Sequence, residues 1–339
     1  MATPHIVCFG ELLLRLSAPG RELLLQSPRL DVCVGGAEAN VAVALAHFGH
    51  AVNMISTVAS NELGEAACGE LRRHGVGTRH VVAAHGRMGL YFLQTGASQR
   101  PSQVLYDRAH SAFALAAPDS YAWPRLLEGA RALHISGVTP AVGPNAAAAA
   151  IAAVRAARER GVHVVFDGNY RSKLWQAWDS DPPRVLREIF SCADTVFANH
   201  RDLALILGND SSSAPPERIA TSAAAAAFDA FPHLQRIVST QRVQHSVDDH
   251  DIGASLITRT HALTAANIRI TGIVDRIGTG DAFAAGVLHG LFAGMSEQDS
   301  LNFGLAAGCL KHSIPGDFFA LGVKDVSEFL AERRFDVRR

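Results

Sequence analysis

Short apolar runs alternate with longer segments of helical spacing along most of the chain. Residues 162–166 and 195–198 are mainly apolar, too short for a helix and followed by polar residues, which is typical of buried strands. Residues 145–160 form an alanine-rich segment of helical length that ends before Gly161. The alternation predicts an α/β fold, a doubly wound and mainly parallel sheet with helices on both faces. Further strands are expected at 6–10, 52–58, 236–240 and just before 137, and further helices at 62–74, 217–231, 282–292, 297–310 and 325–333.

One pair of segments interrupts this alternation. Residues 88–94 and 103–106 are two β-like runs joined by a polar turn, so they predict a hairpin rather than a βα unit. The hairpin carries Tyr91, Tyr106 and Arg108. These side chains could form an amphipathic surface, a dimer contact or the wall of a substrate site.

A turn of small residues lies just before the helix expected at 282–292. At a helix N-terminus the backbone N–H groups are unpaired and the dipole is positive, and Gly278 and Gly280 let an anion approach that backbone closely. Asp281 stands beside the same point. An anion site next to a carboxylate suits phosphoryl transfer, which needs stabilisation of the moving charge and a base for the hydroxyl proton. Taken alone, Gly-x-Gly-Asp is equally consistent with an ordinary helix cap.

The wider sequence around this turn carries a family resemblance. The chain has Asp-x-x-Gly-x-Gly-Asp at 275–281, followed by Ala-Phe-x-x-Gly at 282–286, and a second motif, Val-Gly-Gly-Ala-Glu-Ala-Asn, at 34–40. Together they resemble the two signatures of the ribokinase-like (PfkB) carbohydrate kinases. Both lie about where that family has them, so the resemblance covers nearly the whole chain.

The resemblance implies an architecture and an activity. One ribokinase-like α/β domain would span 1–339, with the segments 11–35 and 88–108 inserted in it as a small β-sheet lid. ATP would donate its γ-phosphoryl group with Mg²⁺ as the metal, and no Walker-type Gly-x-x-x-x-Gly-Lys motif is present. The implied catalytic residues are Gly278, Thr279 and Gly280, whose backbone would form the anion hole, and Asp281, which would act as the base.

Within the family, further motifs are similar to those of 2-keto-3-deoxygluconate kinases. They are the Gly-Gly motif extended to 45, Gly-Leu-Tyr at 89–91, Tyr-Asp-Arg at 106–108, Asp-x-Asn-Tyr-Arg at 167–171 and Lys-His-Ser-Ile-Pro-Gly-Asp-Phe at 311–318. The resemblance implies ATP-dependent phosphorylation of 2-dehydro-3-deoxy-D-gluconate to 2-dehydro-3-deoxy-6-phospho-D-gluconate. The substrate-binding residues that it implies are Gly36, Asn40, Tyr91, Tyr106, Arg108, Asn169, Arg171, Asp281 and Asp317.

The chemistry of a sugar acid agrees with two of these residues. A guanidinium grips a planar carboxylate with two parallel hydrogen bonds, and Arg108 and Arg171 would supply such cations. At 167–171 the alternative is ordinary loop polarity, with Arg171 paired to Asp167. Two different functions stay open: another sugar kinase of the family, such as a fructokinase, and a sugar-binding protein of the same fold with weakened catalysis.

Two departures from the family pattern affect the nucleotide site. The family has Asn-x-x-Glu where this chain has Asn199 and Asp202, and the segment 241–246 lacks the glycine turn that wraps the ATP phosphates in relatives. Arg242 would supply side-chain charge there instead. The expected ATP contacts are Asn199, Thr240, Arg242, Gly278 and Gly280, with Asp202 acting on the metal through water. The acidic run at 248–251 is expected to be a solvated hairpin turn.

Composition narrows the partners and the compartment. The chain has 339 residues and a net charge of −1, so there is no global basic excess for nucleic acid or an anionic membrane. Five scattered cysteines predict reduced thiols and a cytoplasmic protein, and we expect no signal peptide and no membrane span. Because a lid would expose sheet edges, we expect a homodimer or a multiple of one.

Overall fold

The computed structural model describes residues 4–208 and 216–331 and confirms the predicted α/β fold. Its main sheet has nine strands in the order β13-β12-β11-β10-β9-β8-β1-β4-β5. The pairings from β5 to β11 are parallel, whereas β12 and β13 add an antiparallel edge. The strands are β1 (His5–Phe9), β4 (Val52–Ala59), β5 (Gly77–Ala84), β8 (Ala130–Ser136), β9 (His163–Asp167), β10 (Thr195–Phe197), β11 (Arg236–Gln244), β12 (Asp249–Ile257) and β13 (Ala262–Thr271).

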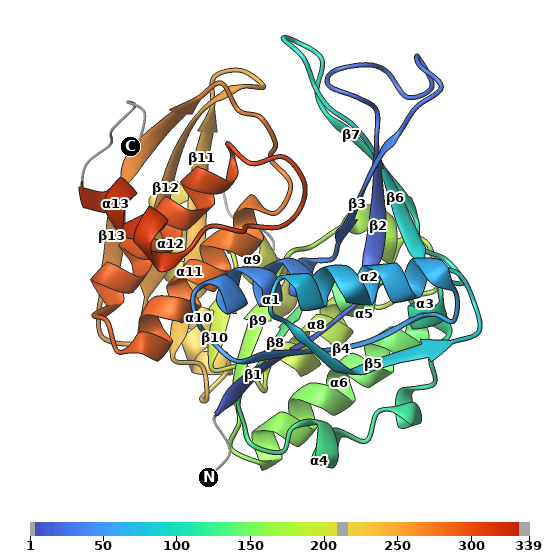
Figure 1. Ribbon diagram of the computed structural model, residues 1–339. Helices are drawn as coiled ribbons and strands as arrows, with labels where there is room; N and C mark the ends of the chain where they lie inside the picture. Colours follow the sequence, from blue (N-terminus) through green and yellow to red (C-terminus); the bar gives the residue numbers. More distant parts are fainter. Residues whose placement is uncertain (1–3, 209–215, 332–339) are drawn as a thin grey trace.

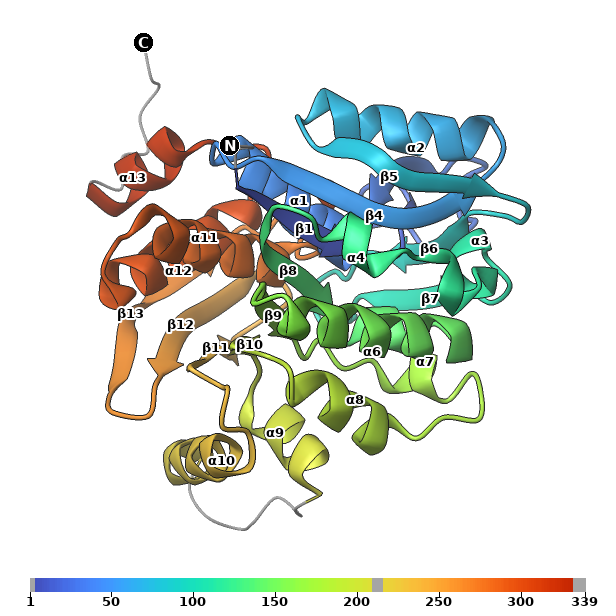
Figure 2. The same cartoon turned by 90° about the horizontal axis from the view of Figure 1, so that it is seen from below.

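Helices cover both faces of this sheet, as Figure 2 shows from below. Alternate residues of a strand point to opposite faces, so Ile6 and Cys8 of β1 belong to one buried cluster and Val7 and Phe9 to the other. The first face holds α1 (Ala37–His47), α2 (Glu62–Arg73), α11 (Thr279–Ala293), α12 (Glu297–Lys311) and α13 (Val323–Ala331). The second face holds α6 (Pro144–Glu159), α8 (Pro182–Phe190), α9 (His200–Leu207) and α10 (Pro216–Ala230), with the short helices α3 (Ala112–Leu115), α4 (Trp123–Leu126), α5 (Val138–Ala141) and α7 (Ser172–Trp175) nearby.

A separate four-stranded sheet rises beside the main one (Figure 1). Its order is β3-β2-β6-β7, from β2 (Leu13–Ser17), β3 (Asp31–Gly35), β6 (Gly89–Gln94) and β7 (Gln103–Asp107). The predicted hairpin is confirmed, since β6 and β7 pair antiparallel. Strands from two distant parts of the chain, within the segments 11–35 and 88–108, therefore meet in one small sheet.

The acidic run at 248–251 is the main correction to the predicted elements. Asp249 begins β12, where its carboxylate pairs with Arg269 of β13 at 2.7 Å, and His250 is fully buried. The turn is 245–248 instead, because β11 continues to Gln244 and pairs there with His250. The sequence also predicts a polar loop at 209–216 and a charged tail at 333–339. Of these residues only Pro216 is described, and it begins α10.

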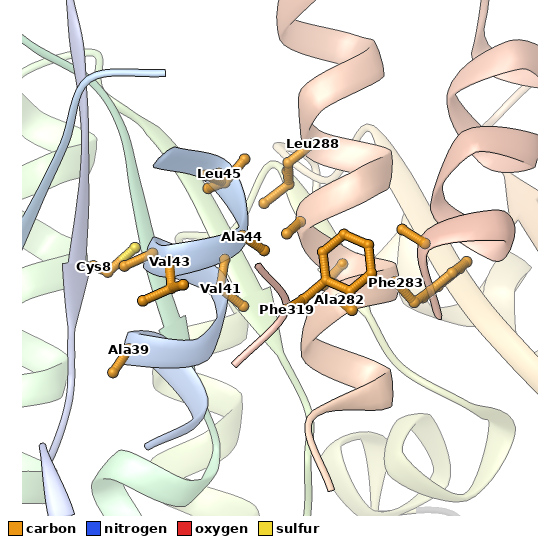
Figure 3. Close-up of a cluster of buried hydrophobic side chains, with 14 of the residues drawn as sticks. Cys8, Ala39, Val41, Val43, Ala44, Leu45, Ala282, Phe283, Leu288 and Phe319 are labelled. Carbon is orange, nitrogen blue, oxygen red and sulfur yellow. The ribbon is translucent and has the colours of Figure 1, made fainter. Parts of the chain in front are cut away.

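The packing of α1 against α11 positions the turns at which both helices begin. Figure 3 shows Val41, Ala44 and Leu45 of α1 beside Ala282 and Leu288 of α11. All five side chains are buried. Because each helix follows a glycine turn of a sequence motif, this apolar contact brings the two motifs together.

Glycines determine how closely α11 and α12 approach each other. A Cβ on Gly304 of α12 would lie 2.3 Å from Val287 Cγ2 and 2.9 Å from Phe283 O of α11. A methyl group therefore does not fit unless the helices separate. No helix among the described residues is both long and apolar enough to cross a membrane.

We expect Gly304→Ala to lower the free energy of unfolding by roughly 1–3 kcal/mol, because the added methyl group meets backbone that cannot give way. Gly69→Ala in α2 is the matched control: its Cβ would meet only the end of Arg72, at 3.8 Å, so better helix propensity should leave stability equal or higher. Urea unfolding of both variants measures the difference. Equal stability of the two would contradict the close packing of α11 on α12.

Candidate active site

A cavity of about 620 Å³ lies between the small sheet and the carboxyl ends of the main strands. Ligands of doubly wound sheets bind at this edge. The predicted residues that line the cavity are Gly36, Asn40, Tyr91, Tyr106, Arg108, Asn169, Arg171, Arg242, Asp317 and the whole turn 278–281. The structure thus brings together all residues predicted for substrate binding and catalysis, although the two motifs are more than 230 positions apart in the sequence.

A second hollow of about 210 Å³ shares Asn169, Arg171 and Gly280 with the cavity. It contains Asn199, Asp202 and Thr240, the remaining residues predicted for the nucleotide and metal. The two hollows therefore meet beside the turn at the start of α11, as a donor and an acceptor of a phosphoryl group would require.

A third recess, of about 510 Å³, lies at the other end of the main strands. Its arginines are already engaged by the protein: Arg158 pairs with Asp194, Arg236 with Glu297, and Arg259 donates to backbone carbonyls. We do not consider it a catalytic site, because it contains none of the predicted residues and its charges are satisfied internally.

The turn before α11 requires glycine at its first position. Gly278 has φ +78°, and a Cβ there would lie 2.1 Å from Asp317 O. Gly280 has no atom near its Cβ position within 4 Å, so its backbone is open to the cavity. Thr279 Oγ1 donates to Arg276 O at 3.1 Å and braces the turn. The N–H groups of the first helical turn can therefore bind an anion.

Asp281 is poised to exchange a proton near neutral pH. The pKa of its carboxyl is raised to about 7, chiefly by burial and also by the nearby Asp317 and Glu38, while a hydrogen bond from Asn40 and the charge of Arg171 oppose the rise. The donor is Asn40 Nδ2, at 2.6 Å from Asp281 Oδ2. This is the pKa range that suits a general base.

Asn40 contacts the base as well as the cavity. The sequence predicted that its amide would bind a sugar hydroxyl, but the amide nitrogen donates to Asp281. Its Oδ1 is buried with no partner among the described residues. That oxygen is the atom of Asn40 that a hydroxyl donor of a ligand could satisfy.

The two predicted arginines are in different electrostatic situations. Arg108 is buried, and its Nε donates to Glu11 Oε2 at 2.5 Å, so its charge is balanced inside the protein. Arg171 is exposed, and its guanidinium donates only to the adjacent Tyr170 O at 3.1 Å among the described residues. The alternative pairing of Arg171 with Asp167 is not a hydrogen bond of the structure. Arg171 is therefore the cation with more free donors for a carboxylate.

Asp317 and Tyr91 are bound to each other. Tyr91 donates to Asp317 Oδ2 at 2.8 Å, and Arg15 lies 3.1 Å from Asp317 Oδ1 and 2.8 Å from Asp275 Oδ2. Burial raises the pKa of the Asp317 carboxyl, and the charge of Arg15 opposes that rise. Both oxygens of Asp317 thus have partners in the protein, which connects the small sheet to the loops around α11.

Asn199 and Asp202 form the N-terminal capping box of α9. The Asn199 side chain accepts hydrogen bonds from the N–H groups of Arg201 and Asp202, and Asp202 accepts one from the N–H of Asn199. Burial raises the pKa of Asp202, and that of Asp167 is raised by burial and by Asp281 and Asp202. The described residues contain no group of three or more His, Cys, Asp or Glu side chains that could hold a metal ion.

Several charged residues in or next to the site were not predicted from the sequence. They are Glu11, Arg15, Glu38, Arg276 and Lys311. Arg15 could have been found because it interrupts an apolar run, LLLRL, and a charged residue among buried neighbours needs a partner. Arg276 lines the cavity with Arg242, and no hydrogen bond or ion pair of either side chain occurs within the described part of the chain. Burial and the charge of Arg242 lower the pKa of Arg276.

Comparisons with known proteins identify the family of this chain. Residues 3–317 match the model of the pfkB family of carbohydrate kinases. The chain is 33% identical to the 2-dehydro-3-deoxygalactonokinase of Haloferax volcanii and 27% identical to the 2-dehydro-3-deoxygluconokinase of Bacillus subtilis, covering 97% of this chain in both cases and 97% and 96% of those proteins.

A solved structure is similar over the same length. The 2-dehydro-3-deoxygluconokinase of Thermotoga maritima is 35% identical, with a TM-score of 0.90 and coverage of 97% of this chain and 100% of that one. The residues matched by the family model include both motifs, so the resemblance inferred from 34–40 and 275–286 is confirmed. This chain belongs to the pfkB family of carbohydrate kinases and is a phosphotransferase with the ribokinase-like fold.

Proposed function

We propose that this enzyme phosphorylates 2-dehydro-3-deoxy-D-gluconate at its terminal hydroxyl, using ATP and Mg²⁺. The observation that carries the proposal is that one cavity holds an anion-binding turn, a carboxyl with its pKa raised to about 7 and an arginine with free donors. The anion-binding turn and the carboxyl with the raised pKa would serve any sugar kinase. The arginine with free donors, Arg171, suits an acceptor that carries a carboxylate.

In the proposed reaction, the terminal oxygen of the sugar acid attacks the γ-phosphorus of ATP. The bond from that phosphorus to the β–γ bridging oxygen breaks, ADP leaves, and Asp281 takes the proton of the attacking hydroxyl. The N–H groups of 278–280 bind the transferred oxygens, as at an oxyanion hole. Bound Mg²⁺ would supply charge neutralisation on the phosphates, and Asp202 would hold it through water.

We assign the remaining residues to the two substrates. Arg171, supported by Asn169, binds the sugar carboxylate, and Gly36, Asn40, Tyr91, Tyr106, Arg108 and Asp317 shape the rest of the acceptor site. Asn199, Thr240 and Arg242, with Gly278 and Gly280, contact ATP. Arg242 replaces backbone contacts with side-chain charge, because β11 continues as a strand through the segment where relatives have a glycine turn.

The same proposal includes the organisation of the protein. The chain is one domain over 1–339, and the small sheet, from 11–35 and 88–108, acts as a lid on the cavity. Its two edge strands expose Val32 and Leu105, each at 60%, which supports a homodimer or a multiple of one through this sheet. Five free thiols support a cytoplasmic location.

A second candidate acceptor follows from the Haloferax volcanii relative, whose name specifies the galactonate epimer. That acid differs from the gluconate form in the configuration of one hydroxyl, so the same carboxylate site would serve both. Fructokinase-like activity, and sugar binding with weakened catalysis, are two further candidate functions that the same assays address.

An acceptor screen tests the proposal. We expect ADP release with Mg-ATP to be strong with 2-dehydro-3-deoxy-D-gluconate and weak with gluconate, fructose and ribose. If the galactonate epimer is turned over faster than the gluconate form, the galactonate acid is the acceptor instead. Turnover of fructose alone would contradict the proposal that the acceptor is a sugar acid.

A variant tests the proposed carboxylate contact. We expect Arg171→Met to raise the KM for the sugar acid roughly 10- to 100-fold, because the charged hydrogen bonds to its carboxylate are lost. Lys173→Met, two residues away, is the control.

We expect Asp281→Asn to lower kcat roughly 10²- to 10⁴-fold while ATP and the acceptor still bind, because the amide keeps the shape but cannot take a proton. Steady-state kinetics and calorimetric titration measure the two quantities. Asp119→Asn, at an exposed position, should retain full activity. An unchanged kcat for Asp281→Asn would show that another group is the base.

The pH dependence should follow the Asp281 carboxyl. The base works in its ionised form, so kcat/KM should rise with pH through about 7 and level off above it. The Asn40 amide stabilises the carboxylate, so Asn40→Ala should raise that apparent pKa by about one unit. Asn145→Ala, at a residue that does not line the cavity, serves as the control. A profile of Asn40→Ala that coincides with that of the wild type would refute the role of this hydrogen bond.

A further inference from the structure

Lys311 is a lysine with no exposed surface, at the last position of α12. Its ammonium donates to two backbone carbonyls, Ile314 O at 2.9 Å and Gly316 O at 2.8 Å. A buried ammonium is costly unless it is hydrogen-bonded and its charge is balanced. A helix C-terminus alone does not require such burial, because an exposed lysine interacts with the last carbonyls equally well.

Opposite charges surround this ammonium. Burial and Arg15 lower the pKa of Lys311, whereas Asp275, Asp317 and Asp281 raise it. Asp275 and Asp317 also bind Arg15. Two cations and two carboxylates thus form a balanced cluster, in which the ammonium can keep its charge.

The cluster lies directly behind the anion-binding turn. Lys311 Cε is 3.3 Å from the position that a Cβ on Gly278 would take. The Gly316 carbonyl accepts from Lys311, and the Gly316 N–H donates to Asp275 Oδ2 at 3.0 Å. Asp275 Oδ1 in turn accepts the N–H of Ile277 at 2.9 Å, one residue before the turn. A continuous chain of hydrogen bonds therefore connects the ammonium to the backbone of the anion site.

We propose that Lys311 is a built-in cation that holds the 277–280 turn in place and adds positive potential behind the transferred phosphoryl group. Lys311 does not line the cavity, so it is a positioning residue that acts through the turn. The inference rests on the proposed phosphoryl transfer at Asp281. It adds that the enzyme carries within its own fold a positive charge next to the anion site.

Two substitutions of Lys311 distinguish the effect of its charge from the effect of its packing. Lys311→Met removes the charge but fills the space, whereas Lys311→Ala removes both and leaves room for a small cation. We expect kcat to fall at least tenfold in both, with KM for ATP and the acceptor changed less than threefold. Ammonium or potassium chloride at about 100 mM should restore kcat several-fold in Lys311→Ala and not in Lys311→Met, and choline chloride should restore neither. Lys324→Ala, which is exposed on α13, is the control.

If Lys311 only fills space, Lys311→Met should be more active than Lys311→Ala in every salt. That result, or wild-type kcat in a folded Lys311→Met, would overturn the proposal. A second measurement needs no variant. Because the cation is built in, the wild-type rate should be the same in choline and in potassium chloride, and a several-fold stimulation by potassium would also overturn it.

The acceptor in these assays is the one with the highest turnover in the acceptor screen. If the ketodeoxy sugar acid is inactive, the proposed substrate fails, but another sugar still reports on Lys311. If only the cation dependence fails, the substrate assignment is unaffected.

Discussion

The packing of α1 against α11 is the contact on which the site depends. Each helix begins at a glycine that no other residue could replace: a Cβ on Gly36 would lie 2.3 Å from Glu11 O, and one on Gly278 would lie 2.1 Å from Asp317 O. Because buried alanine, valine and leucine side chains fill the space between the helices, their first turns lie side by side. The hydrogen bond from Asn40 to Asp281 then crosses from one motif to the other.

Buried charge is the second constraint on the structure. Arg15 of the small sheet binds Asp275 and Asp317, which belong to the loops around the start of α11. Apolar contacts alone would allow the small sheet several orientations, whereas a buried ion pair loses much of its stabilisation when its geometry changes. We infer that these pairs fix the orientation of the small sheet over the cavity. The same carboxylates balance the ammonium of Lys311, so the cavity wall and the anion turn share one electrostatic network.

Much of the site could be predicted from the sequence, because the residues of a motif are local and their spacing is visible. The turn 278–281 and its glycines are examples. What could not be predicted is the partner of each side chain. Arg108 and Arg171 looked equivalent as carboxylate ligands, yet Glu11 neutralises only Arg108. Asn199 and Asp202 were expected only at the nucleotide and its metal, but they also cap α9. Arg108 and Glu11 are 97 positions apart, so no local pattern records their pairing, whereas the capping box lies within four residues and its Asn-x-x-Asp spacing was visible in the sequence.

The sequence by itself determined the alternation of strands and helices, the two glycine turns and the family of the chain, since these depend on local periodicity and on backbone conformations that only certain residues adopt. The tertiary structure decided that 249–251 belong to a strand, that Asn40 contacts the base and that Lys311 is buried behind the anion turn. Each of these results from long-range packing, which sets the dielectric environment and the neighbours of a charged group. A pattern along the chain contains no direct record of either.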